Sequence, residues 1–360
     1  MIKQRNISIE LLRIVSCLLV IGIHVLPPYE IYITQNITDS EKIISLLFQC
    51  LVRVGLPVFF VISGIFLLNC KVENIFVFYK KRLLSLLIPF FVFSILHFAI
   101  AKLPVGNVSL LNLAIEYFKE LLSSTGISFH FWFVYSMLGI YLVTPLVSLL
   151  LSSVSSRNAL FVLLFLIVIK AYNLYCKGLI AGFSIPDINI WLVYFIIGGL
   201  IPRLPKAPMK VYLLAFFSAY ASTCIVTYAQ IAFQPSTYLA PFDTGLNMIV
   251  MSVSLCMIFH SYNWNASGLI GGIVSKVAGN TYGVYLIHLV VLSNVTTMYD
   301  FSWYVGESLQ YGLLMIAIVF TISLIIAFVM NAVVVNPLLK LLIRQRDDKS
   351  SKDNLGIDAK

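Results

Sequence analysis

The sequence has little charge: only 11% of its 360 residues are Asp, Glu, Lys or Arg, while 60% are hydrophobic. Water-soluble domains carry about 25% charged and ~45–50% apolar residues, so the composition excludes a soluble globule. Its six cysteines are scattered singly, without the paired spacing of a zinc or redox site. Together with a mean hydropathy of +0.96, the scarcity of charge indicates that a lipid bilayer is the solvent.

Long apolar runs fill most of the chain. A membrane-spanning helix needs about 20 apolar residues, and continuous apolar runs favour helices over barrel strands, which alternate with period two. We therefore predict an all-α integral membrane protein, a bundle of about ten transmembrane helices. The runs lie near residues 8–28, 46–69, 83–101, 131–152, 159–176, 188–202, 211–233, 244–261, 281–298 and 311–339.

Basic residues gather on one side of the predicted bundle. With the N-terminus placed in the cytoplasm, most of the 24 lysines and arginines fall in cytoplasmic segments, and the acidic residues lean to the other side. This is the positive-inside pattern, so both termini are predicted to be cytoplasmic, and the net charge of +9 is assigned to orientation and not to nucleic acid. We predict a transmembrane core over residues 1–345 and a polar, disordered cytoplasmic tail over 346–360.

The first apolar run carries ionisable residues on one helix face. His24 lies eleven positions after Arg13, a rotation of about 1100°, close to a whole number of turns. The face must point into the protein, because a charge in hydrocarbon costs at least about 2.5–3.5 kcal/mol. The axial rise of about 16 Å places Arg13 towards the cytoplasm and His24 towards the outer leaflet.

Two interpretations of this face remain open. In the functional one, His24 is a general base that takes a proton from an acceptor hydroxyl near neutral pH. In the structural one, Glu10 and Arg13 form an i,i+3 ion pair near the headgroups, and His24 is a buried, hydrogen-bonded residue.

Two further basic groups are candidates. Arg53 opens a segment containing Pro57 and Gly64, which loosen a helix and free backbone groups to line a cavity. Alternatively Arg53 extends to the outer headgroups. The cluster Lys80, Lys81 and Arg82 either holds the phosphates of a cytosolic ligand or serves orientation alone.

Polar aromatic segments supply candidate acceptor-binding residues. His130, Trp132 and Tyr135 open the fourth run, where an aromatic belt accounts only for the tryptophan and phenylalanines. Tyr285 and His288 share a helix face in the ninth run, either as ligands or as buried polar packing. The remaining histidines, His97 and His260, are interpreted as structural.

Taken together, these segments resemble the membrane-bound acyltransferase family 3, bacterial proteins that O-acylate cell-surface glycans. The resemblance rests on several elements in order along most of the chain. They are Leu12-Arg13 followed after ten residues by His24, the segment Arg53 to Gly64, the cluster Lys80 to Arg82 with Pro89, the block His130 to Phe133, and the segment Thr281 to His288.

The resemblance implies a ten-helix core, an acyl-CoA donor from the cytoplasm and a saccharide acceptor on the other side. It ties Arg13 and His24 to activity. The family's larger members append an extracytoplasmic esterase-like domain, and nothing remains after the last apolar run to build one. The chain thus looks more like members that acetylate O-antigen or enterobacterial common antigen, with transfer completed in the core or by a polysaccharide assembly partner.

The predicted activity is transfer of an acyl group, most simply acetyl, to a hydroxyl of a cell-surface polysaccharide or its lipid-linked precursor in the bacterial inner membrane. Acetyl-CoA would be a co-substrate, with no tightly bound cofactor and no metal. His24 would be the base, Arg13 would hold phosphate or pantetheine groups, and Arg53 would stabilise charge.

Other mechanisms and functions stay open. Transfer could be direct or pass through an acyl-enzyme carried by His24, Ser63 or Tyr135. A transporter or exporter of a glycan precursor would also place charges along a membrane pathway. In a purely structural scaffold of an assembly complex, Arg13, His24 and Arg53 would be dispensable.

Overall fold

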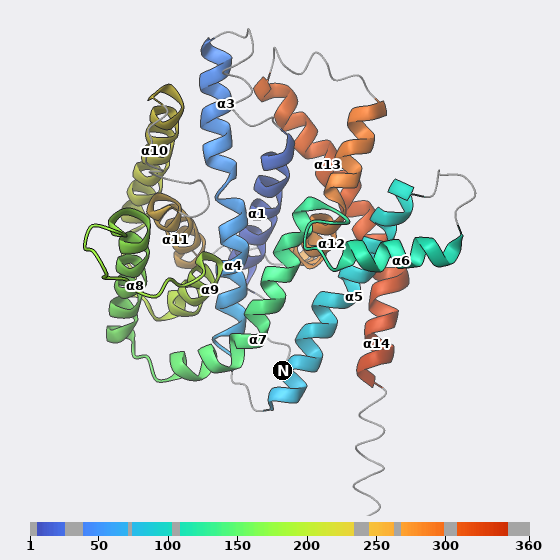
Figure 1. The fold of residues 1–360 in the computed structure, drawn as a ribbon, viewed down its shortest axis with the longest axis horizontal. Coiled ribbons are helices and arrows are strands. Elements are labelled where there is room, and N and C mark those ends of the chain that lie inside the picture. The colour runs from blue at the N-terminus through green and yellow to red at the C-terminus, as the bar shows by residue number, and fades with distance from the viewer. Residues whose placement is uncertain are drawn as a thin grey trace, which may run out of the picture.

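The computed structural model describes residues 6–25, 39–70, 74–102, 109–233, 245–262, 268–298 and 308–344. Within these ranges every regular element is helical, which confirms the predicted all-α class (Figure 1). Eight helical segments there are long and apolar enough to cross a membrane, and two shorter apolar helices cover Ile190–Arg203 and Leu246–Ser261. The number of spans and their orientation stay predictions, and the predicted tail lies outside the described residues.

Helix α1 (Ile7–Val25) lies at the centre of the bundle (Figure 1). It packs against α4 (Gly55–Leu67), α12 (Gly268–Met298) and α13 (Ser308–Met330). Protein surrounds the helix on several sides, so its ionisable residues are shielded from lipid. The predicted inward orientation of this face follows from that packing.

The second apolar run is broken. Helix α3 (Asp39–Val52) ends at a turn formed by Arg53 and Val54, and α4 then begins at Gly55. Pro57 is the third residue of α4, where a backbone N–H has no intrahelical acceptor, so the proline costs no hydrogen bond. The break places Arg53 inside the candidate membrane span Ser40–Leu67, a few residues before Pro57, where the sequence predicted a loosened helix.

Gly55 allows α4 to approach α1 closely. A Cβ atom at this position would lie 2.7 Å from the Leu19 Cβ and 2.8 Å from the Ser16 carbonyl oxygen, both on α1. Real Cβ atoms do not tolerate such distances. The glycine therefore brings the turn at Arg53 against the central helix.

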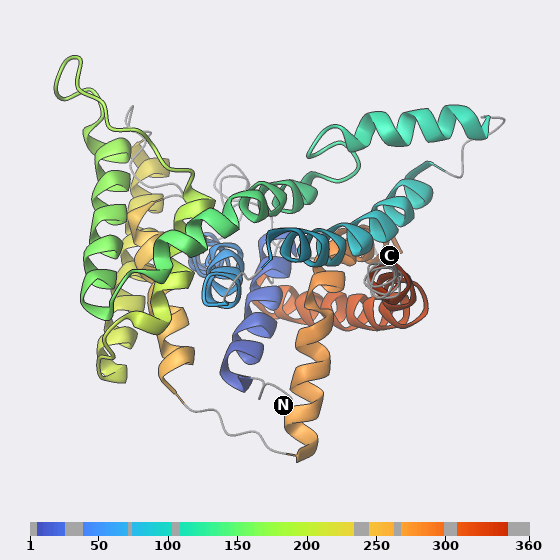
Figure 2. The same cartoon turned by 90° about the horizontal axis from the view of Figure 1, so that it is seen from below.

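The other helices lie on two sides of α1 and α4 (Figures 1 and 2). One side contains α8 (Ser156–Ala171), α9 (Ile190–Leu200), α10 (Met209–Phe233) and α11 (Leu246–Ser261). The other side contains α5 (Ile75–Lys102), α12, α13 and α14 (Asn336–Arg344). Helix α7 (Trp132–Ser152) connects the two sides, with contacts to α4, α5 and α9. This arrangement brings α1, α5, α7 and α12 together around the candidate site.

Helix α6 (Leu110–Leu121) extends away from the bundle (Figure 2). Its exposed face carries Leu111, Ile115 and Phe118, which are 68%, 58% and 61% exposed. A helix of this length is too short to span a bilayer, and its apolar and polar faces are separated. This stretch is not among the apolar runs of the sequence, because a hydropathy average cancels the two faces of an amphipathic helix.

The opposite face of α6 is tied to α5. The Tyr117 hydroxyl lies 2.8 Å from the Ser94 hydroxyl, and Lys102 Nζ lies 2.7 Å from Glu116 Oε1. Burial raises the pKa of the Tyr117 phenol, although its hydrogen bond with Ser94 acts in the opposite direction. The neutral hydroxyl therefore remains available for this contact.

Candidate active site

Two ionisable residues of helix α1, Arg13 and His24, line two different cavities. Arg13 lines a cavity of about 220 Å³, here called the Arg13 cavity. His24 lines a second one of about 760 Å³ that opens to the surface, here called the His24 cavity. Because eleven residues of helix separate them by about 16 Å, one helix reaches both cavities at different depths.

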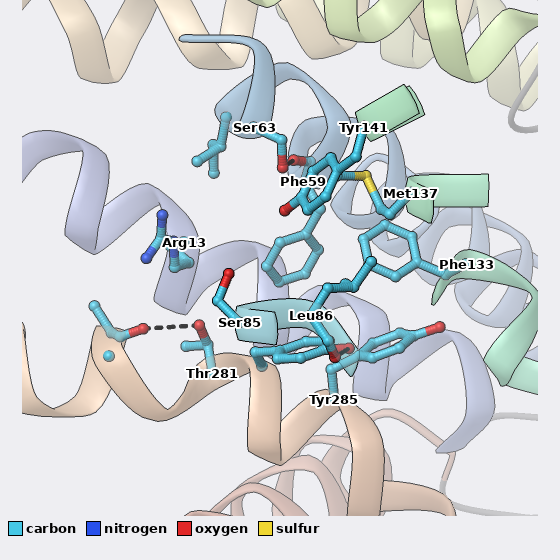
Figure 3. Close-up of a pocket in the computed structure, with 14 residues that line it drawn as sticks. Arg13, Phe59, Ser63, Ser85, Leu86, Phe133, Met137, Tyr141, Thr281 and Tyr285 are labelled. Carbon is cyan, nitrogen blue, oxygen red and sulfur yellow. Dashed lines mark hydrogen bonds between the residues drawn. The ribbon is translucent and has the colours of Figure 1, made fainter. Parts of the chain in front are cut away.

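The Arg13 cavity combines one cation with hydroxyl groups and aromatic rings (Figure 3). Ser63 comes from α4, Tyr141 from α7, and Thr281 and Tyr285 from α12. The guanidinium carbon of Arg13 lies 5.3 Å from the centroid of the Phe66 ring, within the range of a cation–π contact. Arginine suits phosphate and carbonyl oxygens because it always carries its charge and donates in a fixed fork.

Pro89 shapes the wall of this cavity on α5. A proline inside a helix has no N–H, so the carbonyl of Ser85, four residues earlier, loses its helical donor. Ser85 and Leu86 both line the cavity, and the Tyr282 hydroxyl donates to the Leu86 carbonyl oxygen at 3.0 Å. Pro89 therefore leaves one backbone carbonyl on this wall without its helical donor.

The His24 cavity is lined on one side by a row of small polar residues. Ser293, Asn294, Thr296 and Thr297 belong to the last turns of α12, and Ser128 precedes the short 3-10 helix at Phe129–Phe131. Hydroxyl and amide groups both donate and accept hydrogen bonds. This lining suits a ligand rich in hydroxyl groups.

Four histidines from separate elements lie close together at the inner side of the His24 cavity, two of them in its lining. His24 lies on α1, His97 on α5, His130 in the 3-10 helix and His288 on α12. Ring centroids are 5.4 Å apart for His24 and His288, 5.0 Å for His130 and His288, and 5.6 Å for His97 and His130. In the part of the chain that the structure describes, no group of three such side chains has the arrangement of a metal site.

Carbonyl partners fix the protons on three of these rings. His97 Nε2 and His130 Nε2 lie 2.7 Å and 3.3 Å from the Leu286 carbonyl oxygen, and a carbonyl can only accept, so both nitrogens donate. Neutral His130 then accepts at Nδ1 from the Ser128 hydroxyl at 2.8 Å. By the same reasoning, His288 donates from Nδ1 to the Tyr285 carbonyl oxygen at 2.6 Å.

Tyr285 lines the Arg13 cavity (Figure 3) and also contacts two of the histidines. Its ring centroid lies 5.3 Å from that of His130 and 5.7 Å from that of His288. Its hydroxyl donates to the His130 carbonyl oxygen. Tyr285 and His288 therefore form a short connection from the Arg13 cavity to His24.

Two further arginines act on the site through their charge. Arg53, at the turn between α3 and α4, is close enough for its charge to affect the His24 imidazole. Arg82, near the start of α5, acts together with Arg13 on Tyr141, which lines the Arg13 cavity. Arg53 therefore lies in the surroundings of the His24 cavity, and Arg82 adds a second guanidinium near the Arg13 cavity.

Comparison with known proteins identifies the kind of chemistry. The acyltransferase domain family matches residues 6–332. The chain belongs to acyltransferase family 3. Searches of curated proteins and of solved structures found no match. The family match includes all of α1, both cavities and the four histidines, and it makes the protein an acyltransferase of the membrane.

Five residues predicted from the sequence come together in this family 3 chain. Arg13 and Tyr285 line one cavity, His24 lines the other, and the rings of His130 and His288 lie against Tyr285. Their roles in acyl transfer remain predictions. The fold does bring residues of the first and ninth predicted apolar runs into contact, as His24 and His288 show.

Other candidates lie away from both cavities. Lys80 and Lys81 are on the first turns of α5 and line neither cavity. Trp132 packs against Trp191 with ring centroids 5.0 Å apart, and the Tyr135 hydroxyl donates to the Leu121 carbonyl oxygen at 2.5 Å. The last two side chains therefore join helices where the sequence suggested acceptor binding.

His97 and Ser128 were missed as members of the site. His97 was interpreted as structural, yet it lines the His24 cavity and contacts His130. Its position inside a long apolar helix was the available indication, because ionisable residues at membrane depth are costly and usually functional. Ser128 lies in a connection between helices and carried no pattern of its own.

Proposed function

We propose that this protein transfers an acyl group, most simply acetyl, from acyl-CoA to a hydroxyl of a cell-surface polysaccharide or its lipid-linked precursor. The observation that carries the proposal is that α1 places Arg13 in one cavity and His24 in another, within a family 3 acyltransferase. A transferase whose two substrates arrive from different sides needs such an arrangement.

The donor is assigned to the Arg13 cavity. Its guanidinium would hold phosphate or pantetheine oxygens, and Arg82 adds positive charge beside Tyr141. The cavity of about 220 Å³ is smaller than the roughly 300–1,000 Å³ of sites that enclose drug-sized ligands. We therefore propose that only the thioester end of the donor enters, while its nucleotide stays outside.

The acceptor is assigned to the His24 cavity, whose serine, threonine and asparagine side chains suit sugar hydroxyls. His24 would remove the hydroxyl proton as that oxygen attacks the thioester carbon. Arg53 would stabilise negative charge that develops in the transition state. The location proposed for this chemistry is the bacterial inner membrane, with polysaccharide assembly proteins as partners.

Purified protein in detergent tests the proposal. Acetyl-CoA and the de-esterified surface polysaccharide of the host bacterium are supplied together, and free CoA thiol is measured against an enzyme-only blank, because the protein itself has six cysteines. Thiol release that needs both substrates is expected. The same protein with His24→Ala should lose about 10²–10⁴-fold in rate while remaining folded and membrane-inserted.

A transporter of glycan precursors predicts a different result. It would release no thiol with either protein, and a scaffold would behave in the same way. Full activity of folded His24→Ala protein would contradict the assignment of the base. Labelled acetyl-CoA supplied without acceptor separates the two chemical routes, because only an acyl-enzyme retains label on the protein.

A further inference from the structure

One buried ring nitrogen of the histidine cluster has no hydrogen-bond partner among the described residues. His288 is fully buried, at 0% exposure. Its Nδ1 donates to the Tyr285 carbonyl oxygen, so in the neutral ring Nε2 carries a lone pair. Among the described residues this Nε2 has no partner, although it is buried. Buried polar atoms are nearly always paired, so an unpaired one calls for an explanation.

The His24 ring lies next to this lone pair. Its centroid is 5.4 Å from that of His288, and the ring planes are tilted by 38°. His130, the other histidine next to His288, has both ring nitrogens occupied: Nε2 donates to the Leu286 carbonyl oxygen, and Nδ1 accepts from the Ser128 hydroxyl. His24 is therefore the neighbouring ring that remains able to donate an N–H to His288.

We propose that His288 is a positioning residue whose Nε2 accepts the N–H of His24 and thereby fixes the tautomer of the base. This inference rests on the proposed function. Catalytic hydrogen bonds are often long before substrate binds and shorten in the reactive complex. The Tyr285 carbonyl, His288 and His24 then form an ordered chain in which each member determines the proton position on the next.

The chain defines the proton transfers of the reaction. One nitrogen of His24 donates to His288, and the other takes the proton of the acceptor hydroxyl while its oxygen forms a bond to the thioester carbon. The carbon–sulfur bond then breaks, and the departing thiolate takes that proton from His24. The products are the ester and the free CoA thiol, and both histidines return to their starting state.

Two substitutions at position 288 separate this role from packing. In His288→Asn the amide N–H replaces Nδ1 and keeps the bond to the Tyr285 carbonyl, but the acceptor at Nε2 is lost. In His288→Gln the amide oxygen restores an acceptor near the Nε2 position. We expect His288→Asn to lower kcat about 100-fold with less than a threefold change in KM for acetyl-CoA, and His288→Gln to recover activity to within tenfold of the unmodified protein.

A double variant tests whether His288 acts through His24. Adding His288→Asn to His24→Ala should cause no further loss, because residues that act as a unit are not additive. Three results would each overturn the proposal. They are near-normal kcat in His288→Asn, an equal loss of kcat in His288→Asn and His288→Gln, and a further loss when His288→Asn is added to His24→Ala. Thiol release by the unmodified protein keeps these outcomes distinct from failure of the proposed function, in which that protein is itself inactive. Thermal unfolding of every variant confirms that it is folded.

Discussion

At Arg13, the cost of placing a charge inside an apolar bundle is set against the use of that charge in binding. A guanidinium at membrane depth is costly, and the protein accommodates it beside the Phe66 ring and at the edge of a cavity with hydroxyl groups. Stability alone would favour an apolar side chain here. The residue's position is more readily understood as a binding site for an anionic or strongly polar group.

Replacing Arg13 by glutamine should therefore weaken donor binding. Hydrogen bonds to charged groups contribute about 1.5–3 kcal/mol, so we expect Arg13→Gln to raise KM for acetyl-CoA by roughly 10- to 100-fold. The measurement is initial rates of thiol release over a range of acetyl-CoA concentrations. Arg157→Gln is the matched control, because Arg157 is exposed on α8 and lines neither cavity.

A result in which both arginine variants shift KM equally would point to net charge as the cause. An unchanged KM for acetyl-CoA in Arg13→Gln would contradict the assignment of the donor to the Arg13 cavity. The two outcomes separate a local contact from a general attraction between a basic protein and an anionic substrate.

At single positions, the sequence identified residues that periodicity places on a shared helix face. Arg13 and His24 could be predicted because eleven residues form nearly whole turns. Trp132 and Tyr135 could not be resolved in the same way, since residues three apart share a face whatever that face contacts. Their packing on Trp191 and on the Leu121 carbonyl depends on contacts between helices, which the periodicity within one helix does not specify.

At the scale of elements, close helix contacts define the frame around the site. Helices α4 and α9 meet at Gly64 and Gly198, where an added Cβ on Gly64 would collide with the Phe195 carbonyl oxygen and one on Gly198 with the Val61 carbonyl oxygen. Backbone atoms cannot move aside as flexible side chains can. Small residues of this kind let membrane helices pack closely.

We expect Gly64→Ala to lower the melting temperature in detergent by at least about 5 °C, because overpacking costs roughly 1–3 kcal/mol or more. Gly139→Ala is the control. Gly139 lies on α7 with nothing within 4 Å of its added Cβ, and alanine favours a helix by about 0.5–1 kcal/mol. An unchanged melting temperature for Gly64→Ala would mean that the helices separate without cost.

Helix α6 should lie in the interface between membrane and water. Its stripe of Leu111, Ile115 and Phe118 is exposed on the protein but is of the kind that inserts among acyl chains. A tryptophan at Phe118 should fluoresce at shorter wavelength than one at Asn112, which is exposed beside the stripe. Brominated lipids should quench the first more strongly, measured as a difference from the unmodified protein with its four tryptophans.

Equal quenching at positions 118 and 112 would place α6 in water. The sequence alone did not reveal this helix, because neither length nor average hydropathy distinguishes it from a loop. The break between α3 and α4 was predicted only as a loosening at Pro57 and Gly64, and not as a turn at Arg53. Hydropathy shows that Arg53 and Pro57 lie within an apolar run. The turn there depends on the close approach of Gly55 to α1, which is a tertiary contact that hydropathy does not report.

For the whole molecule, the class was predictable because the bilayer imposes a simple rule. Backbone groups in lipid must pair internally, so long apolar runs become helices. Which helices become neighbours was not predictable. Helices α1, α5 and α12 are far apart in sequence, and the packing that brings His24, His97 and His288 together follows from side-chain shapes along their whole lengths.

Orientation remains a prediction at this scale. With both termini in the cytoplasm, a green fluorescent protein fused to the C-terminus should fluoresce, and alkaline phosphatase fused there should be inactive. Phosphatase inserted at Gly182, in the described connection between α8 and α9, should be active because this segment is predicted to lie outside. The reverse pattern would place the Arg13 end of α1 outside and exclude the assignment of a cytoplasmic donor to that end.

The position of Tyr285 has a consequence for ion permeability. Its ring lines the Arg13 cavity and lies against the rings of His130 and His288, which are next to His24. A continuous water column through a membrane enzyme would let protons leak down their electrochemical gradient and waste cellular energy. We expect these rings to separate the Arg13 cavity from the His24 cavity, so that the protein can hold one substrate in each and still remain impermeable to ions.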